Sequence, residues 1–246
     1  MTHPDLLLHV PFADSFDAAY ARGNPEGIVD PRGIGPELVD AGAYFGWIAC
    51  ARYYTEKNFN REAGTVMMWF RPEWDADFDD MLGRILWDVR IETGSSVSDD
   101  PSQRWAIVYP NPLGKKLSDR PASTLECWRF CIATDRNLFE SGSSRPRRDE
   151  RSRQALFGSH QSFSAGDWMH LAATWTEEEA ALFIDGKEDV REELRDGLPW
   201  RQLPETMQVG ALATWMNAGA EGVISDFRVY GNALDGETIR DEAEIK

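Results

Sequence analysis

A stretch of alternating runs and turn signals, Ser164 to Val190, limits the possible folds of this chain more than any other segment. Gly166-Asp167 is a turn signal, and a strand after it places Leu171, Ala173 and Trp175 on one face, because successive side chains of a strand point to opposite sides. The next run, Ala180 to Ile184, ends at Asp185-Gly186. Asp-Gly between two β-runs is typical of a type I′ hairpin turn. The stretch therefore predicts a β-meander whose sheet partners come from elsewhere in the chain.

The run from Arg84 to Glu92 has the clearest strand alternation. Its odd-numbered positions are apolar from Ile85 to Ile91, whereas the even-numbered positions include Asp88 and Arg90. This pattern predicts a strand with one dry and one solvent-facing side. Further strands are expected at Leu6–Phe12, Tyr44–Tyr54, Thr65–Phe70, Arg104–Tyr109, Thr124–Ala133, Met207–Leu212 and Gly222–Tyr230.

One helix is expected, at the C-terminal end. Asp235 suits a helix N-cap, Leu234 and Ile239 stand at hydrophobic-staple positions, and Glu237 favours the first turn. Many short strands, turns rich in Gly and Pro, and a single terminal helix together predict an all-β sandwich. No repeat or linker divides the chain, so residues 1–246 are expected to form one domain.

Charge and hydropathy exclude some classes of partner. The net charge of −16 argues against nucleic acid or an anionic membrane surface. No apolar run approaches the roughly 18 residues of a membrane helix, so no membrane insertion is expected. The first ten residues lack the basic start of a signal peptide, which favours either a cytoplasmic protein or a domain of a longer precursor. Cys50 can pair with Cys127 or Cys131, or all three can be buried thiols.

Four segments resemble laminin-G-like domains of the concanavalin A-like lectin/glucanase superfamily. They are the opening LLLHVPFADSFD, the strand GTVMMWFRP, the meander with its WMHLAATW and LFIDGK, and the closing GVISDFRVYGNALDGETI. Their order frames nearly the whole chain, although Trp74 to Ser162 matches only as generic strands. The resemblance implies a jelly roll of two antiparallel sheets.

The resemblance also implies a function, which we expect to be recognition without catalysis. The expected partner is a carbohydrate or a glycoprotein. The domain is expected to be part of a longer protein that lies outside the cell or at the cell envelope. Two alternatives stay open: a glycoside hydrolase of the glucanase branch, and a spacer domain without a ligand. Glucanases carry E-x-D-x-(x)-E on one strand, and Glu73 to Asp77 (EWDAD) imitates that motif imperfectly. We expect that segment to be a solvated acidic loop and assign no catalytic residue; the oligomeric state is left open.

A sugar site on the solvent-facing side of the sheet is the expected binding site. Sugar rings stack on exposed aromatic faces, and planar polar groups fix their hydroxyls. Asp88, Arg90 and Arg129 supply the polar groups, and Trp200 and Trp215 in probable loops supply a rim. The competing interpretation is that the charged residues form cross-strand ion pairs and that most tryptophans are core.

The resemblance further implies a calcium ion between the loop after the first strand and the start of the closing strand. The matching residues are Asp14 and Asp17 in the loop, with Ser225 and Asp226 in the strand. Calcium takes six to eight oxygen ligands, which these residues can contribute. The family's aspartate falls at Ser225, however, so Asp226 replaces it only if a bulge re-aims its side chain.

Overall fold

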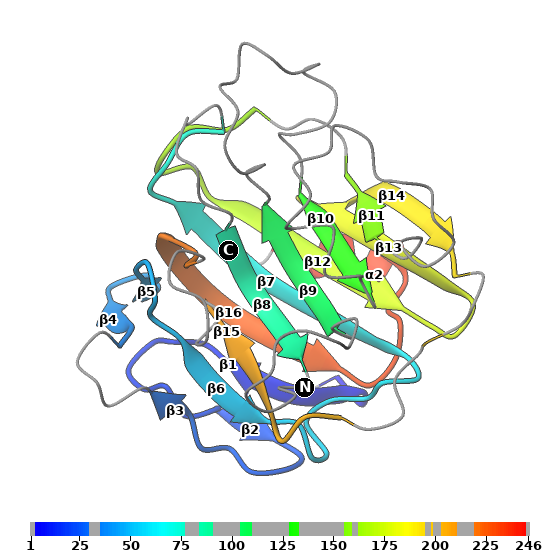
Figure 1. Cartoon of the computed structure of the whole chain (residues 1–246), viewed down its shortest axis with the longest axis horizontal. Helices are drawn as coiled ribbons and strands as arrows, with labels where there is room; N and C mark the ends of the chain where they lie inside the picture. The colour runs from blue at the N-terminus through cyan, green and yellow to red at the C-terminus, as the bar shows by residue number, and fades with distance from the viewer. Residues whose placement is uncertain are drawn as a thin grey trace, which may run out of the picture.

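The described residues form a sandwich of two antiparallel sheets, of nine and seven strands, with one short helix near the C-terminus (Figure 1). The predicted all-β sandwich is therefore confirmed. The computed structural model describes residues 3–29, 35–76, 84–90, 104–109, 128–132, 155–158, 162–194, 198, 203–210 and 219–244.

The nine-stranded sheet is built around β7, which pairs with β12 on one side and β16 on the other. The strand β5 pairs with both β16 and β4. Along the main path the strands are β14 (Lys187–Glu193), β13 (Glu179–Ile184), β12 (Met169–Trp175), β7 (Gly64–Pro72), β16 (Gly222–Tyr230), β1 (Leu6–Val10) and β2 (Tyr20–Ala21), with β5 (Gly42–Phe45) and β4 (Glu37–Val39) beside them.

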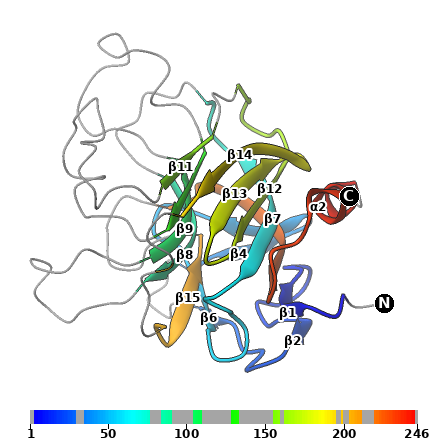
Figure 2. The same cartoon turned by 90° about the vertical axis from the view of Figure 1, so that its right-hand side faces the viewer.

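The seven-stranded sheet lies against the first sheet, and the view in Figure 2 shows the two as separate layers. Its strands, in spatial order, are β11 (Ala155–Phe157), β10 (Arg129–Ile132), β9 (Arg104–Tyr109), β8 (Arg84–Arg90), β15 (Thr206–Val209), β6 (Ala51–Tyr54) and β3 (Ile28–Val29).

An aromatic core fills the space between the sheets. Trp175 from β12 stacks on Trp87 from β8, with ring centroids 6.1 Å apart, and on Phe59, with centroids 5.3 Å apart. Leu171 and Ala173 belong to the same buried cluster, as the alternation of the meander predicts. Stacked aromatic pairs add packing energy beyond the area they bury, so this cluster fixes the two sheets face to face.

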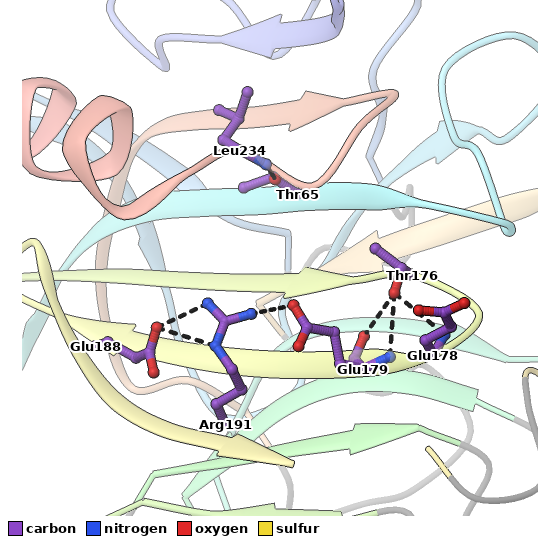
Figure 3. Close-up of polar contacts among 7 residues, drawn as sticks. All are labelled: Thr65, Thr176, Glu178, Glu179, Glu188, Arg191 and Leu234. Carbon is purple, nitrogen blue, oxygen red and sulfur yellow. Dashed lines mark hydrogen bonds and ion pairs between the residues drawn. The ribbon is translucent and has the colours of Figure 1, made fainter. Parts of the chain in front are cut away.

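The meander has the predicted geometry. Asp185 and Gly186 have φ values of 49° and 72°, as a type I′ turn requires, and Ile184 pairs with Lys187 across the two-residue loop. At the other turn, the Thr176 hydroxyl accepts hydrogen bonds from the backbone N–H groups of Glu178 and Glu179, each at 3.1 Å (Figure 3). Both ends of β13 are therefore fixed by turn chemistry.

The helix α2 (Gly236–Ala243) covers the outer face of the nine-stranded sheet (Figure 2). The Asp235 side chain accepts from the Thr238 N–H at 2.8 Å, which confirms the predicted N-cap. Leu234 and Ile239 are buried beside Phe183, so the staple positions are also as predicted. The chain before α2 is held by Thr65 in β7, whose hydroxyl accepts from the Leu234 N–H at 2.9 Å (Figure 3).

Two predicted strands differ from those observed. The run Tyr44–Tyr54 is two strands in different sheets, β5 and β6, because the loop of residues 46–50 lets the chain cross from one layer to the other. In β8 a register shift between Ile85 and Trp87 breaks the strict alternation. Leu86, expected on the solvent-facing side, is therefore buried in the inter-sheet core.

Charged side chains line β14, which ends the main path of the nine-stranded sheet. The Arg191 guanidinium lies between the carboxylates of Glu188, at 2.7 Å, and Glu179 on the neighbouring strand (Figure 3). Such charges discourage an exposed strand from pairing with another chain. Within the described ranges, no helix has the length and apolar character needed to cross a bilayer.

Candidate functional site

A pocket with a volume of about 320 Å³ opens where the segment before β12 meets the β13–β14 turn. Its walls combine aromatic, apolar and carboxylate side chains from the seven-stranded sheet and from the meander. They are Trp128, Ser162, Phe163, Asp167, Trp168, Met169, Ile184 and Asp185. Pockets that bind small molecules begin at about this size and combine apolar walls with a few polar groups.

The loop of residues 162–168, which forms one wall, is fastened to the end of β7. The Gly166 N–H donates to the Pro72 carbonyl at 2.8 Å, and the Ala165 N–H donates to Asp75 Oδ1, also at 2.8 Å. Gly166 has a φ of 91°, a conformation that favours glycine. These contacts give the loop a defined shape before any ligand enters.

Two carboxylates stand at this pocket, each oriented by a backbone N–H. Asp167 Oδ2 accepts from the Ser164 N–H at 3.0 Å, and Asp185 Oδ1 accepts from the His170 N–H at 2.9 Å. Both side chains are exposed. The second oxygen of each carboxylate accepts from no residue that the structure describes. Each carboxylate can therefore accept a further hydrogen bond from a ligand.

Trp168 supplies an aromatic surface at the pocket. Its side chain is half-buried, and the guanidinium carbon of Arg71 lies 5.2 Å from its ring centroid. A cation stacked on an indole is stabilised by the ring quadrupole, and this contact restricts the orientation of the ring. The part of Trp168 that remains exposed is available for contact with a flat apolar face.

Trp128 forms the buried end of the pocket. Its ring is fully buried and stacks on Phe163, with centroids 6.2 Å apart, and it contacts Tyr109 edge to face at 5.1 Å. Its Nε1–H is buried and donates to no acceptor among the described residues. Trp128 therefore gives the pocket an apolar aromatic wall, held in place by its packing against Phe163 and Tyr109.

Asp88 and Arg129, which the sequence predicts as binding residues, lie on the same face of the seven-stranded sheet. Asp88 in β8 pairs with Ala106 in β9, and Arg129 in β10 pairs with Val108, two residues along the same strand. Cross-strand partners share a face, so Asp88 and Arg129 do as well. Asp88 is only 1% exposed, however, and Arg129 is half-buried. The predicted solvent-facing side is therefore wrong at Asp88.

The remaining predicted binding residues have side chains that the structure does not describe. The backbone of Arg90 ends β8 opposite Arg104, and its side chain lies outside the described part of the chain. Trp200 and Trp215 also lie outside the described residues. Their role in ligand binding stays a prediction.

Two of the four predicted calcium ligands, Asp17 and Asp226, bind other partners through their carboxylates. Asp226 lies in a register shift of β16 with a φ of 53°, so a bulge does re-aim its side chain. Its carboxylate contacts His9 Nε2 at 2.6 Å and Arg228 Nη2 at 2.8 Å. In the loop, Asp17 Oδ1 accepts from the Gly27 N–H at 2.9 Å, and Asp14 is exposed. The backbone of Ser225 pairs with Trp69.

The electrostatics of this cluster do not suit a cation. Burial raises the pKa of Asp226, but the hydrogen bond from His9 and the charge of Arg228 outweigh it and lower that pKa. Glu242 from α2 also binds Arg228. Among the described residues no group of three or more His, Cys, Asp or Glu could hold a metal ion. The described contacts therefore do not fit the expected calcium site, and calcium binding stays a prediction from the sequence.

The segment that imitates the glucanase motif has a structural role. Trp74 is buried and its Nε1–H donates to the Ala220 carbonyl at 3.0 Å, while Asp75 holds the pocket loop through Ala165. Glu73 and Asp75 are exposed, as the solvated-loop interpretation expects, and Asp77 lies outside the described residues.

The pocket residues were missed as a site by the sequence patterns. The sequence predicts Gly166-Asp167 and Asp185-Gly186 only as turns, and it places Trp128 only within the expected strand Thr124–Ala133. The one usable signal is that both turns carry an aspartate and that Trp168 directly follows the first of them.

Comparisons with known proteins agree with this fold. Residues 128–240 match a family model described as the concanavalin A-like lectin/glucanases superfamily. This match covers slightly less than half of the chain and includes every residue named above as lining the pocket. No curated protein matches the sequence at a significant level.

Three solved structures share the fold at low identity. The binding domain of botulinum neurotoxin DC in complex with rat synaptotagmin II has a TM-score of 0.59 and 14% identity, and the one in complex with SialylT has 0.58 and 14%. Each match covers 98% of this chain and 51% of the toxin chain. A Trypanosoma rangeli sialidase has a TM-score of 0.59 and 13% identity, covering 98% of this chain and 33% of the sialidase.

This chain thus spans about half the length of the toxin domains and a third of the sialidase, and at these identities the likeness shows the fold alone. The family match is independent of that likeness and falls on the meander and the closing strand. Residues 128–240 are therefore similar in sequence to the concanavalin A-like lectin/glucanases superfamily, and the two-sheet architecture of the described residues agrees with that similarity.

Proposed function

We propose that this domain is a non-catalytic recognition module that binds a carbohydrate, free or carried by a glycoprotein, in the pocket beside Trp168. One observation carries the proposal: a half-exposed indole and two oriented carboxylates, Asp167 and Asp185, stand at the same pocket. The sheet face around Asp88 is a weaker candidate, because a buried carboxylate offers little surface to a sugar.

The chemistry of a pyranose matches these groups. One face of the ring exposes C–H groups, which pack against an aromatic face such as that of Trp168. The hydroxyls around the ring can donate to the second oxygens of Asp167 and Asp185. Charge-assisted hydrogen bonds of this kind are roughly twice as strong as neutral ones, so two of them orient a small ligand.

The pre-formed loop supports the same proposal. Because Gly166 and Ala165 are already bonded to the end of β7, little conformational entropy is lost when a ligand binds. Similar toxin domains have been solved with a protein and with SialylT, which agrees with a recognition role for the fold without naming the ligand of this chain.

The test is a glycan array probed with the wild-type protein, Trp168→Ala and Trp47→Ala. Trp47 is a matched control, because it is 48% exposed and lies outside the pocket. We expect Trp168→Ala to weaken binding about tenfold or more, because loss of an aromatic contact removes both area and stacking. Trp47→Ala is expected to bind like the wild type, and both variants must retain the wild-type melting curve.

The same experiment separates the alternatives. A spacer domain predicts that no glycan is bound by any of the three proteins. A glycoside hydrolase predicts that reducing sugar is released from the bound glycans during incubation. Binding that survives in Trp168→Ala would place the site elsewhere and contradict the proposal.

A further inference from the structure

We infer that the pocket selects saccharides without negative charge and rejects those that carry a carboxylate or sulfate. This inference rests on the proposed function, since it concerns the ligand class of the same pocket. It follows from the charges that line the pocket and from the hydrogen-bonding groups that remain available there.

The charges at the pocket have one sign. Asp167 and Asp185 line it, and a third carboxylate, Asp75, is bonded to the adjacent loop at Ala165. None of the described residues that line the pocket is cationic. The chain as a whole carries a net charge of −16, which adds a long-range repulsion of anions. An anionic sugar would meet like charges at close range, which opposes binding.

Arg71 does not reverse this conclusion. Its guanidinium lies over the Trp168 ring and is not among the groups that line the pocket. Because Arg71 is not a lining residue, its positive charge lies farther from a bound sugar than the two carboxylates of Asp167 and Asp185.

The hydrogen-bond balance points the same way. The pocket offers two acceptors, the second oxygens of Asp167 and Asp185, which accept from no described residue. A sugar hydroxyl can donate a hydrogen bond, so a neutral saccharide can satisfy both oxygens. A carboxylate or sulfate only accepts, and it would leave the aspartates desolvated without a donor.

The experiment compares matched glycan pairs, one neutral and one with the same scaffold capped by sialic acid or carrying sulfate. The proteins are the wild type, the double variant Asp167→Asn with Asp185→Asn, and Glu178→Gln. Asparagine keeps an acceptor for the Ser164 and His170 N–H groups and tolerates the positive φ of Asp185. Glu178 is the control, because it is an exposed carboxylate outside the pocket.

We expect the wild type to bind the neutral member of each pair at least about tenfold more tightly than the anionic member. In the double variant the ratio of the neutral to the anionic affinity is expected to be smaller. In Glu178→Gln this affinity ratio is expected to be unchanged. Raising the salt concentration with the wild type is expected to narrow it as well, because screening weakens exposed like-charge repulsion. The measurement at raised salt uses only the wild-type protein, so it does not depend on the folding of a variant.

Two outcomes overturn the inference in distinguishable ways. Equal or tighter binding of the anionic members would overturn the charge selectivity and leave the proposed recognition function standing. No binding of any member by the wild type would overturn the proposed function together with this inference.

Discussion

Asp185 is bonded to both backbone groups of His170: its N–H donates to the His170 carbonyl at 2.8 Å, and its Oδ1 accepts from the His170 N–H at 2.9 Å. The turn residue of the β13–β14 hairpin is thereby tied to the start of β12. The same contact orients the Asp185 carboxylate at the pocket. One side chain therefore serves both the fold of the meander and the site.

The first prediction concerns this turn. Asp185→Ala should lower the free energy of unfolding by about 1–3 kcal/mol, because it removes the bond to His170 and puts alanine at a φ of 49°. Asp185→Asn should cost less than about 0.5 kcal/mol, since asparagine accepts the same bond and tolerates this conformation. Urea denaturation followed by tryptophan fluorescence measures both. Equal losses for the two variants would show that the carboxamide does not replace this contact.

A second prediction concerns the junction of β7 and α2. The Thr65 hydroxyl is buried, accepts from the Leu234 N–H and donates to the Asn232 carbonyl, each at 2.9 Å. Thr65→Val keeps the shape but leaves both groups without their partner, and should cost about 2–3 kcal/mol. Thr65→Ser keeps the hydroxyl and should cost about 1 kcal/mol for the lost methyl group. A thermal melt of both variants is the check, and a serine variant less stable than the valine variant would contradict this role.

A third prediction is a pH dependence from Asp226. The groups that face it are His9 from β1, Arg228 and Tyr230 from β16, and Glu242 from α2. Burial raises the pKa of Asp226, but His9 and Arg228 lower it by a larger amount. The pKa of Asp226 in the folded protein is therefore below its pKa in the unfolded chain. The stabilisation is therefore present above the unfolded pKa, about 3.9, and is lost as the pH falls through the folded pKa.

The matched variant is Asp226→Asn, which keeps the size of the side chain and removes its charge. At pH 7 it should be less stable than the wild type by about 1.5–3 kcal/mol, the range for hydrogen bonds to charged groups. The difference should shrink as the pH falls below 4. Urea denaturation at a series of pH values measures it, and a difference that is constant with pH would exclude Asp226 as its source.

The fourth prediction concerns calcium. Because the Asp226 carboxylate is bonded to His9 and Arg228, we expect the melting temperature to be the same in millimolar calcium and in chelator. A folded-state site at 100 times its Kd would add about 2.7 kcal/mol and raise the melting temperature. Such a rise, abolished in Asp226→Asn, would restore the calcium site expected from the sequence.

Much of the fold could be predicted from the sequence, because local sequence patterns determine many of its strands and turns. The Asp185-Gly186 turn, the alternation at Leu171, Ala173 and Trp175, and the Asp235 cap each depend on neighbours in the chain. Two features do not depend on chain neighbours: the division of Tyr44–Tyr54 between two sheets, and the bulge in β8. Both are set by packing between strands that are distant in sequence.

The candidate site was less predictable for the same reason. Trp128 and Asp185 lie 57 positions apart in the chain, and only the packing of β10 against the meander brings them to one pocket. The alternation of apolar and polar residues in β8 places Asp88 on the face opposite the core. It could not predict that the Asp88 side chain is buried on that face. The burial of an outer sheet face depends on the whole chain.

The most direct test of the central claim follows the indole N–H signals of the protein by nuclear magnetic resonance while a neutral glycan that binds on the array is added. Trp128→Phe, Trp168→Phe and Trp47→Phe assign the three signals. Binding in the pocket predicts that the signals of Trp128 and Trp168 shift with a common saturation curve, and that the signal of exposed Trp47 stays in place. Saturable binding that leaves the Trp128 and Trp168 signals unmoved would contradict the assignment of the pocket as the carbohydrate site.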